Sequence, residues 1–128
     1  MNNIDILKFL LQQPKIEIHE NSFKECDLLT QFDIPSSEES IKPGTFCGCK
    51  SLANISLPSS ITSIGYDAFK LCQSLTQISI PSLVTVISDN AFYGCLSLVQ
   101  ITIPPSVTTI GNYAFKKCSS LKLINLPH

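Results

Sequence analysis

The sequence predicts a solenoid built from short stacked strands, and a 23-residue internal repeat is the main reason for this prediction. Four residue types recur every 23 positions in one shared register, without an insertion. A second reason is that apolar and polar residues alternate early in each unit, as in a strand with one buried face. The four series are Pro35, Pro58, Pro81, Pro104 and Pro127; Phe23, Phe46, Phe69, Phe92 and Phe115; Cys26, Cys49, Cys72, Cys95 and Cys118; and Leu29, Leu52, Leu75, Leu98 and Leu121.

The unit that begins at Leu75 illustrates how each coil is expected to form. Leu75 and Ile78 point inward while Gln77 between them points outward, which predicts a short half-buried strand. The proline that follows ends the strand, because proline cannot donate a hydrogen bond to a ladder. The β-prone run 84–87 predicts a second strand, and 91–95 predicts a single helical turn that returns toward the next unit.

One unit is too small to bury its own apolar face, so neighbouring units must stack. We therefore expect an α/β solenoid with a parallel strand ladder on its concave face and short strands and helical turns on its convex side. The chain of 128 residues is expected to form a single domain, 1–128. Its expected coils are a degenerate one over 6–28 with Phe9 and Leu11 in strand positions, four repeats over 29–51, 52–74, 75–97 and 98–120, and a partial repeat over 121–128.

Three segments of the unit resemble the BspA-like subgroup of leucine-rich-repeat proteins: Ile78-x-Ile80-Pro81, Ser60–Gly65 and Ala68–Leu75. The resemblance extends from about Ile6 to Pro127. It implies a leucine-rich-repeat fold and a protein-interaction module, often on surface proteins that bind host or matrix proteins, and so a surface adhesin or antigen. It carries over no catalytic residue. The alternatives are a self-assembling structural segment and an intracellular scaffold or regulatory subunit.

In one respect the unit departs from the common leucine-rich-repeat pattern. That pattern has asparagine or cysteine near the end of the strand, so an asparagine ladder is not expected in this chain. The residues found at this place are Ser37, Ser60, Leu83 and Ser106.

The cysteines are expected to be structural. Five of the six recur once per unit, so they should stack inward as small hydrophobic side chains. A disulfide framework is the rival, because the count is even. Identical positions on adjacent coils, however, form a ladder rather than selected pairs. Cys47 lies outside this register, so we expect its thiol to be at the surface. The Cys47-Gly48-Cys49 segment is by itself only weak evidence for a metal-binding site, because zinc sites need four ligands. We expect no metal and no cofactor.

Composition argues against several classes of function. The formal net charge is −1, and Lys116-Lys117 is the longest basic run, which disfavours nucleic acid as a partner. The two histidines, His19 and His128, and the lack of a glycine-rich phosphate loop predict neither catalysis nor a small-molecule substrate. The adjacent acids Glu38 and Glu39 indicate a solvated loop rather than a catalytic pair. A catalytic imidazole–thiol pair would have to join His19 to Cys26, but Cys26 belongs to the series that is expected to be buried.

Localisation is left open by the sequence. The longest apolar stretch, Ile6–Leu11, is interrupted by Lys8 and is too short to span a membrane. The first residues lack a basic region, so we expect no secretory signal. Family resemblance favours the cell surface, whereas the expected lack of a signal peptide and unpaired cysteines favour the cell interior.

The outward strand positions are the predicted protein-binding surface, because solenoids commonly bind partners on the concave face. They are polar, small and mostly uncharged, and they lack the Tyr, Trp and Arg that anchor tight interfaces, so binding should be weak or multivalent. A merely soluble sheet face is the alternative. These positions form two columns along the expected strand ladder. The first column extends to Lys8 at one end and Leu123 at the other, and the second extends to Leu10 and Asn125. The predicted contact residues are Gln31, Asp33, Asn54, Ser56, Gln77, Ser79, Gln100 and Thr102.

The two ends of the array pose a further problem, because an uncovered coil exposes apolar side chains and backbone groups. The segment 4–11 is apolar on both faces, so it should form a short helix over the first coil or a strand that a partner covers. At the other end no polar helix follows to cover Ile110, Phe115 or Cys118. We expect the edge strand to be covered by further repeats or by a second copy, through a two-fold contact or head to tail. Its self-association residues are Leu121, Ile124 and Leu126.

Overall fold

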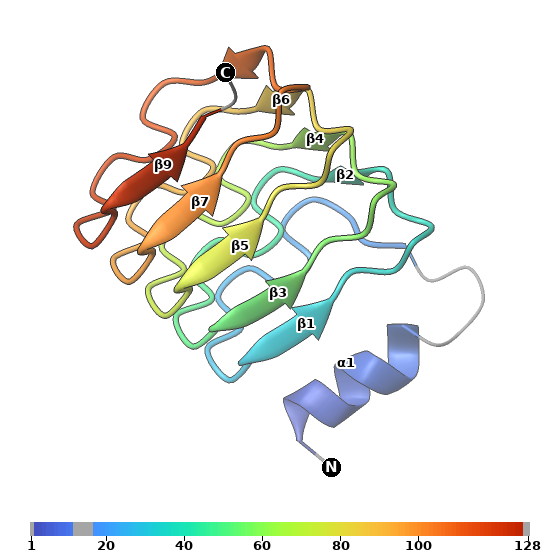
Figure 1. Cartoon of the computed structure of the whole chain (residues 1–128). Helices are drawn as coiled ribbons and strands as arrows, with labels where there is room; N and C mark the ends of the chain where they lie inside the picture. Colours follow the sequence, from blue (N-terminus) through green and yellow to red (C-terminus); the bar gives the residue numbers. More distant parts are fainter. Residues whose placement is uncertain (1, 12–16, 127–128) are drawn as a thin grey trace.

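The computed structural model describes residues 2–11 and 17–126, which form a solenoid of stacked coils (Figure 1). Every recorded strand pair is parallel, and paired residues are 23 positions apart, as the repeat predicted. The elements are α1 (Asn3–Leu11), β1 (Gln31–Asp33), β2 (Ser40–Ile41), β3 (Asn54–Ser56), β4 (Ser63–Ile64), β5 (Gln77–Ser79), β6 (Val86–Ile87), β7 (Gln100–Thr102), β8 (Thr109–Ile110) and β9 (Leu123–Asn125).

The strands form two ladders that run along the solenoid. The three-residue strands β1, β3, β5, β7 and β9 lie in one row, with recorded pairing of β1 with β3 and of β5, β7 and β9 in order. The two-residue strands β2, β4, β6 and β8 form the second ladder. The apolar core lies inside the coils, which confirms the predicted solenoid and its short convex strands.

The third side of each coil is a chain of hydrogen-bonded turns, so the predicted helical turn over 91–95 is wrong. Two residues per coil, four positions apart, have a left-handed backbone that an α-helix of L-residues cannot contain. In the coil 75–97 these are Asn90 (φ 58°) and Gly94 (φ 72°). Backbone bonds between coils replace helical ones, as when the N–H of Phe92 donates to the carbonyl of Ala114 at 2.9 Å.

The phenylalanine series forms a stack along the core. Ring centroids of Phe46 and Phe69 are 5.4 Å apart, and those of Phe69 and Phe92 are 5.3 Å apart. These three side chains are fully buried, as predicted. Phe115 stacks on Phe92 at 5.5 Å but is only partly buried, because no described coil lies beyond it.

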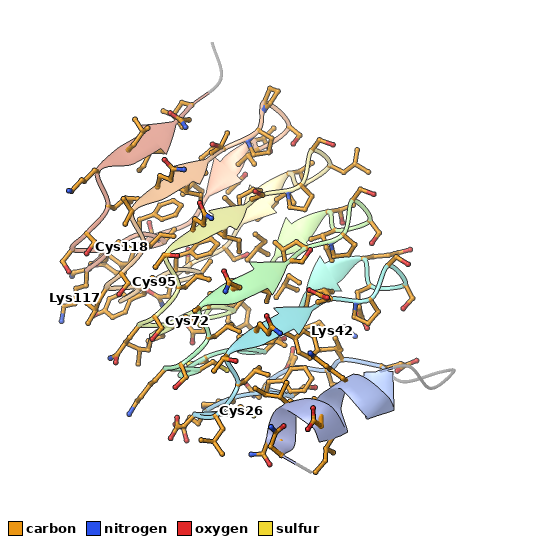
Figure 2. All side chains as sticks on the ribbon, turned by 60° about the horizontal axis from the view of Figure 1, so that its bottom comes forward. Cys26, Lys42, Cys72, Cys95, Lys117 and Cys118 are labelled. Atoms are coloured by element: carbon orange, nitrogen blue, oxygen red, sulfur yellow. The ribbon has the colours of Figure 1, made fainter. Side chains whose placement is uncertain are left out.

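The cysteine series forms a second column beside the phenylalanines (Figure 2). Each thiol from Cys49 onward donates to a phenylalanine carbonyl of the preceding coil; the Cys72 Sγ lies 3.2 Å from the carbonyl oxygen of Phe46. The equivalent distances are 3.0 Å for Cys49, 3.1 Å for Cys95 and 3.1 Å for Cys118. All six cysteines are free. The exception to the expected burial is Cys26, which is only partly buried because its coil is the first of the stack.

Burial is the largest cause of the raised pKa of four of these thiols, Cys26, Cys47, Cys49 and Cys72. Burial raises the pKa of Cys49 to about 12 and also raises the pKa of Cys72. The pKa of Cys26 is raised by burial and by Asp27. Burial and the charge of Asp67 raise the pKa of Cys47, but Lys24 and Lys70 partly offset that rise.

Among the five cysteines other than Cys118, we therefore predict that Cys47 reacts fastest with a thiol reagent at about pH 8, followed by Cys26, because these two are the least buried and the thiolate is the nucleophile. Cys49, Cys72 and Cys95 should react at least about a hundredfold more slowly, since their coils must separate first. Timed alkylation and peptide mass spectrometry would measure each rate, with the denatured chain as control. Rapid labelling of Cys72 in the native protein, or a disulfide among the three buried cysteines, would contradict the prediction.

The N-terminal segment is helical, so the strand expected around Phe9 and Leu11 is wrong. The Asn2 side-chain oxygen caps α1 by accepting the N–H of Asp5 at 2.9 Å. Ile4 and Leu7 share one helix face at a three-residue spacing and pack against the core. The helix that the sequence offered as one alternative is thus confirmed.

Lys8 and Leu10 consequently do not extend the outward strand columns. In the part of the chain that the structure describes, no helix has the length and apolar character needed to cross a membrane.

Glu38 corrects another expectation, because its side chain is buried rather than solvated. Its Oε1 accepts the N–H of Ile18 at 3.2 Å. The Lys42 Nζ donates to the carbonyl of the same residue at 2.7 Å, reaching down from its own coil (Figure 2). The two side chains tie the first coil to the second. Glu39 is exposed, as expected.

Candidate interaction surfaces

The eight predicted contact residues are all exposed on the row of three-residue strands. They form two columns because parallel pairing keeps equivalent residues in register: Gln31 pairs with Asn54, and Ser79 pairs with Thr102. The strand residue between the two columns points inward, as with Ile78, which is 5% exposed. We call this surface the concave face, defined by Gln31, Asp33, Asn54, Ser56, Gln77, Ser79, Gln100 and Thr102.

A shallow depression of about 340 Å³ lies on the concave face over β1, β3 and β5. Six of the eight predicted residues line it, whereas Gln100 and Thr102 lie outside it on β7. Half-buried Ile55 and Leu57 add an apolar contribution. The six polar lining residues are Gln31, Asp33, Asn54, Ser56, Gln77 and Ser79.

The chemistry of the concave face is that of neutral hydrogen bonding. Amide and hydroxyl side chains both donate and accept, and Asp33 is the one charged member of the eight. Within the described residues, the one recorded side-chain hydrogen bond on this row joins the Asn125 Nδ2 to the Thr102 Oγ1 at 3.2 Å. The eight residues of the concave face are all exposed to solvent.

A second hollow, of about 410 Å³, separates α1 from the first strand of the row. The sequence did not predict it, because it left open whether residues 4–11 form a helix or a strand. The signal that could have revealed it is the helical spacing of Ile4 and Leu7. The lining residues are Ile4, Lys8, Leu29, Gln31, Phe32, Asp33, Ile34 and Pro35.

The predicted self-association residues lie around β9, at the last described coil. Ile124 belongs to β9 and is 41% exposed, while Leu126 just beyond it is 62% exposed and Leu121 before it is half-buried. The described residues of this edge are therefore apolar and mostly exposed. Leu123, Ile110 and Tyr113 add to it with exposures of 49%, 46% and 62%.

The histidine that sequence analysis considered for catalysis has an acidic partner. The His19 Nε2 lies 3.5 Å from a carboxylate oxygen of Glu17, and both side chains are largely exposed. His128 lies outside the described residues. Over residues 2–11 and 17–126, no three His, Cys, Asp or Glu side chains gather into a group able to hold a metal ion.

The solenoid is similar to solved bacterial structures. A leucine-rich cell surface protein from Faecalibacterium prausnitzii A2-165 is 39% identical, with a TM-score of 0.83 over 87% of this chain and 29% of that chain. A T. pallidum leucine-rich-repeat protein is 37% identical, with a TM-score of 0.82 over 85% of this chain and 51% of that one. A leucine-rich-repeat protein from Bacteroides ovatus ATCC 8483 is 37% identical, with a TM-score of 0.76 over 79% and 26%.

This chain thus spans between about a quarter and a half of the length of these proteins. No curated protein matches it significantly. A family model described as the BspA-type leucine-rich-repeat region matches residues 16–128 with six copies. The six matched copies are consistent with the 23-residue register and with the parallel strand ladders of the structure. The chain therefore belongs to the BspA-type leucine-rich-repeat family.

Proposed function

We propose that this protein is a protein-interaction module that binds its partner on the concave face. The supporting observation is the depression over β1, β3 and β5, where two in-register columns of exposed amide and hydroxyl groups meet. Solenoids of repeated units use such extended concave surfaces for binding.

The properties of this face define the kind of partner. Asn54, Ser56, Gln77 and Ser79 at its centre carry no charge, so a polar and uncharged protein surface fits best. The face has no aromatic or arginine anchor, so a single contact should be weak. Several copies of the module acting together would raise the overall affinity without new contacts.

The test uses variants that change one face only. Asn54→Lys with Gln77→Lys places two charges on the concave face, and Thr62→Lys with Thr85→Lys places two charges beside the second ladder, where both threonines are exposed. Proteins captured from the native source by the immobilised chain should be lost with the first variant and retained with the second. A captured protein that binds both variants equally would place recognition on another surface.

Adhesion at a cell surface is the finer role that we propose. It is supported by the F. prausnitzii relative, which is described as a cell surface protein. An intracellular scaffold is the alternative, and the six free thiols favour it, because thiols persist in reducing compartments. Antibody labelling of intact source cells should detect the protein if it is an adhesin, whereas labelling that requires permeabilised cells would support the scaffold.

A further inference from the structure

The turns on the third side of the coils carry the aromatic side chains that the concave face lacks. All three tyrosines of the chain lie on these turns. Tyr66 is 57% exposed, Tyr113 is 62% exposed and Tyr93 is half-buried. Tyrosine is enriched among the residues that anchor protein interfaces, so this side of the solenoid offers anchors for a partner.

Lysine side chains lie over two of these rings. The Lys70 Nζ is 5.4 Å from the ring centroid of Tyr93, and the Lys117 Nζ is 5.7 Å from the same centroid. The Lys116 Nζ is 4.6 Å from the ring centroid of Tyr113. Because the face of a ring attracts an ammonium group at these distances, the rings hold the lysines in place without neutralising their charge. We call this surface the turn face, defined by Tyr66, Lys70, Tyr93, Tyr113, Lys116 and Lys117.

Positive charge is concentrated on the turn face. Lys70, Tyr93 and Lys116 occupy the same place on three successive coils, 23 residues apart. The earlier members of this row are Lys24 and Cys47, so the row contains three lysines and no acid. Residues 90–128 likewise contain three lysines and no acid.

The acids on the three turns that carry the tyrosines are directed into the protein. The Asp89 Oδ1 accepts the N–H of Asn112 at 2.7 Å, and the Asp67 Oδ1 is buried. Both acids come at the start of their turns, whereas the lysines of the turn face come near the end of theirs. The lysine part of the turn face is therefore positively charged.

The turn face points sideways from the stack rather than along its axis. Lys70 and Tyr93 belong to inner coils with a described coil on either side, and both are still partly exposed. The backbone groups of the turns point along the axis instead, as when the N–H of Leu71 donates to the carbonyl of Tyr93 at 2.7 Å. Figure 2 shows Lys117 at the outer edge of the turns, on the side away from the strands. Exposure of this inner part is therefore independent of what adjoins either end of the stack.

We propose that the turn face binds an acidic, extended segment of a partner protein. The carboxylates of the segment meet Lys70, Lys116 and Lys117, and its apolar groups pack against the tyrosine rings. The turn face is a second interaction surface, and this inference does not depend on a partner at the concave face.

The spacing of the lysines indicates the conformation of the bound segment. Lys70 and Lys116 are two coils apart, which is about 10 Å at the usual separation of neighbouring strands. A polyproline II segment presents every third residue on one side, about 9 Å apart. An acid at every third position can therefore face both lysines, while prolines between the acids contact the rings, as in other proline-rich recognition. A nucleic acid fits less well, because its binding depends on neutralising many phosphates.

Fluorescence anisotropy of a labelled peptide of repeated Glu-Pro-Pro triplets, added to the 128-residue chain, tests the proposal. We expect saturable binding that weakens at least about tenfold when the ionic strength is raised from about 0.02 M to about 0.5 M. A peptide of the same composition with its glutamates in one block should bind at least about fivefold more weakly, because its carboxylates no longer match the lysine spacing. A Gln-Pro-Pro peptide should show no saturable binding.

Variants of the chain locate the binding site. Lys70→Glu with Lys116→Glu should weaken binding of the Glu-Pro-Pro peptide at least about tenfold and should allow a Lys-Pro-Pro peptide to bind instead. Lys8→Glu with Lys122→Glu is the matched control, because it makes the same charge change on α1 and beside β9, away from the turn face. This control should leave the affinity within about twofold, and circular dichroism would verify that each variant folds.

Three results would overturn the proposal. One is the absence of saturable binding of the Glu-Pro-Pro peptide at low salt. Another is equal weakening by the turn-face variant and the control variant, which would indicate only a general attraction between opposite charges. The third is binding of a heparin fragment or of single-stranded DNA without binding of the peptide, which would assign the turn face to a different class of polyanion.

Discussion

Replacing Phe69 by alanine is expected to lower the free energy of unfolding by about 3–5 kcal/mol, the range for a buried phenylalanine. The side chain is fully buried, and its ring stacks on Phe46 at 5.4 Å and on Phe92 at 5.3 Å. The substitution removes both ring contacts and leaves a cavity in the middle of the stack. Because each coil contacts only its neighbours, we expect local opening to begin at this coil.

Urea denaturation followed by circular dichroism would measure the loss, and amide exchange would locate the opening. Leu83→Ala is the matched control, because Leu83 is 57% exposed and its removal should change stability by less than about 0.5 kcal/mol. If Phe69→Ala unfolded at the same urea concentration as the unmodified chain, the register of the phenylalanine column would be wrong.

Replacing Gly65 by valine should destabilise the protein by about 3 kcal/mol through overpacking. The N–H of Gly65 donates to the carbonyl of Ile41 at 2.7 Å, which draws two coils close together. A Cβ at Gly65 would lie 2.8 Å from that carbonyl oxygen and 2.8 Å from the nitrogen of Pro43. Both atoms belong to the backbone, so relief requires the coils to move apart.

Ser88 occupies the equivalent position one coil later and already carries a side chain, so Ser88→Ala should be nearly neutral. Thermal unfolding of both variants gives the comparison. An undiminished melting temperature for Gly65→Val would show that the coils separate at this point without loss of stability.

The inner coils could be predicted from the sequence because the same side chains recur in the same places. The period of 23 sets the register between coils, and the alternation around Ile78 sets which side chains point inward. These two facts also place Gln77 and Ser79 on the concave face. The depression there could not be predicted from the sequence, because its depth depends on how deeply the half-buried residues that line it, such as Ile55, are buried.

The mistaken expectations have physical causes. Apart from Lys8, residues 6–11 are all apolar, so their pattern did not separate a helix from a strand. The left-handed turns were missed because Leu71, with φ 62°, is a residue type that rarely adopts this conformation. Burial of Glu38 depends on the N–H of Ile18, which lies 20 residues away in a coil without a clear repeat pattern.

The cysteine column provides the chain with one natural reporter in each coil. The thiols of Cys49, Cys72 and Cys95 each donate a hydrogen bond to a backbone carbonyl of the preceding coil. Each thiol becomes reactive when that coil moves away from it. Their individual alkylation rates therefore give the opening frequency of successive coil boundaries, with no engineered label. Comparing the rates along the column would show whether the stack frays from α1 inward, from β9 inward, or from both ends at once.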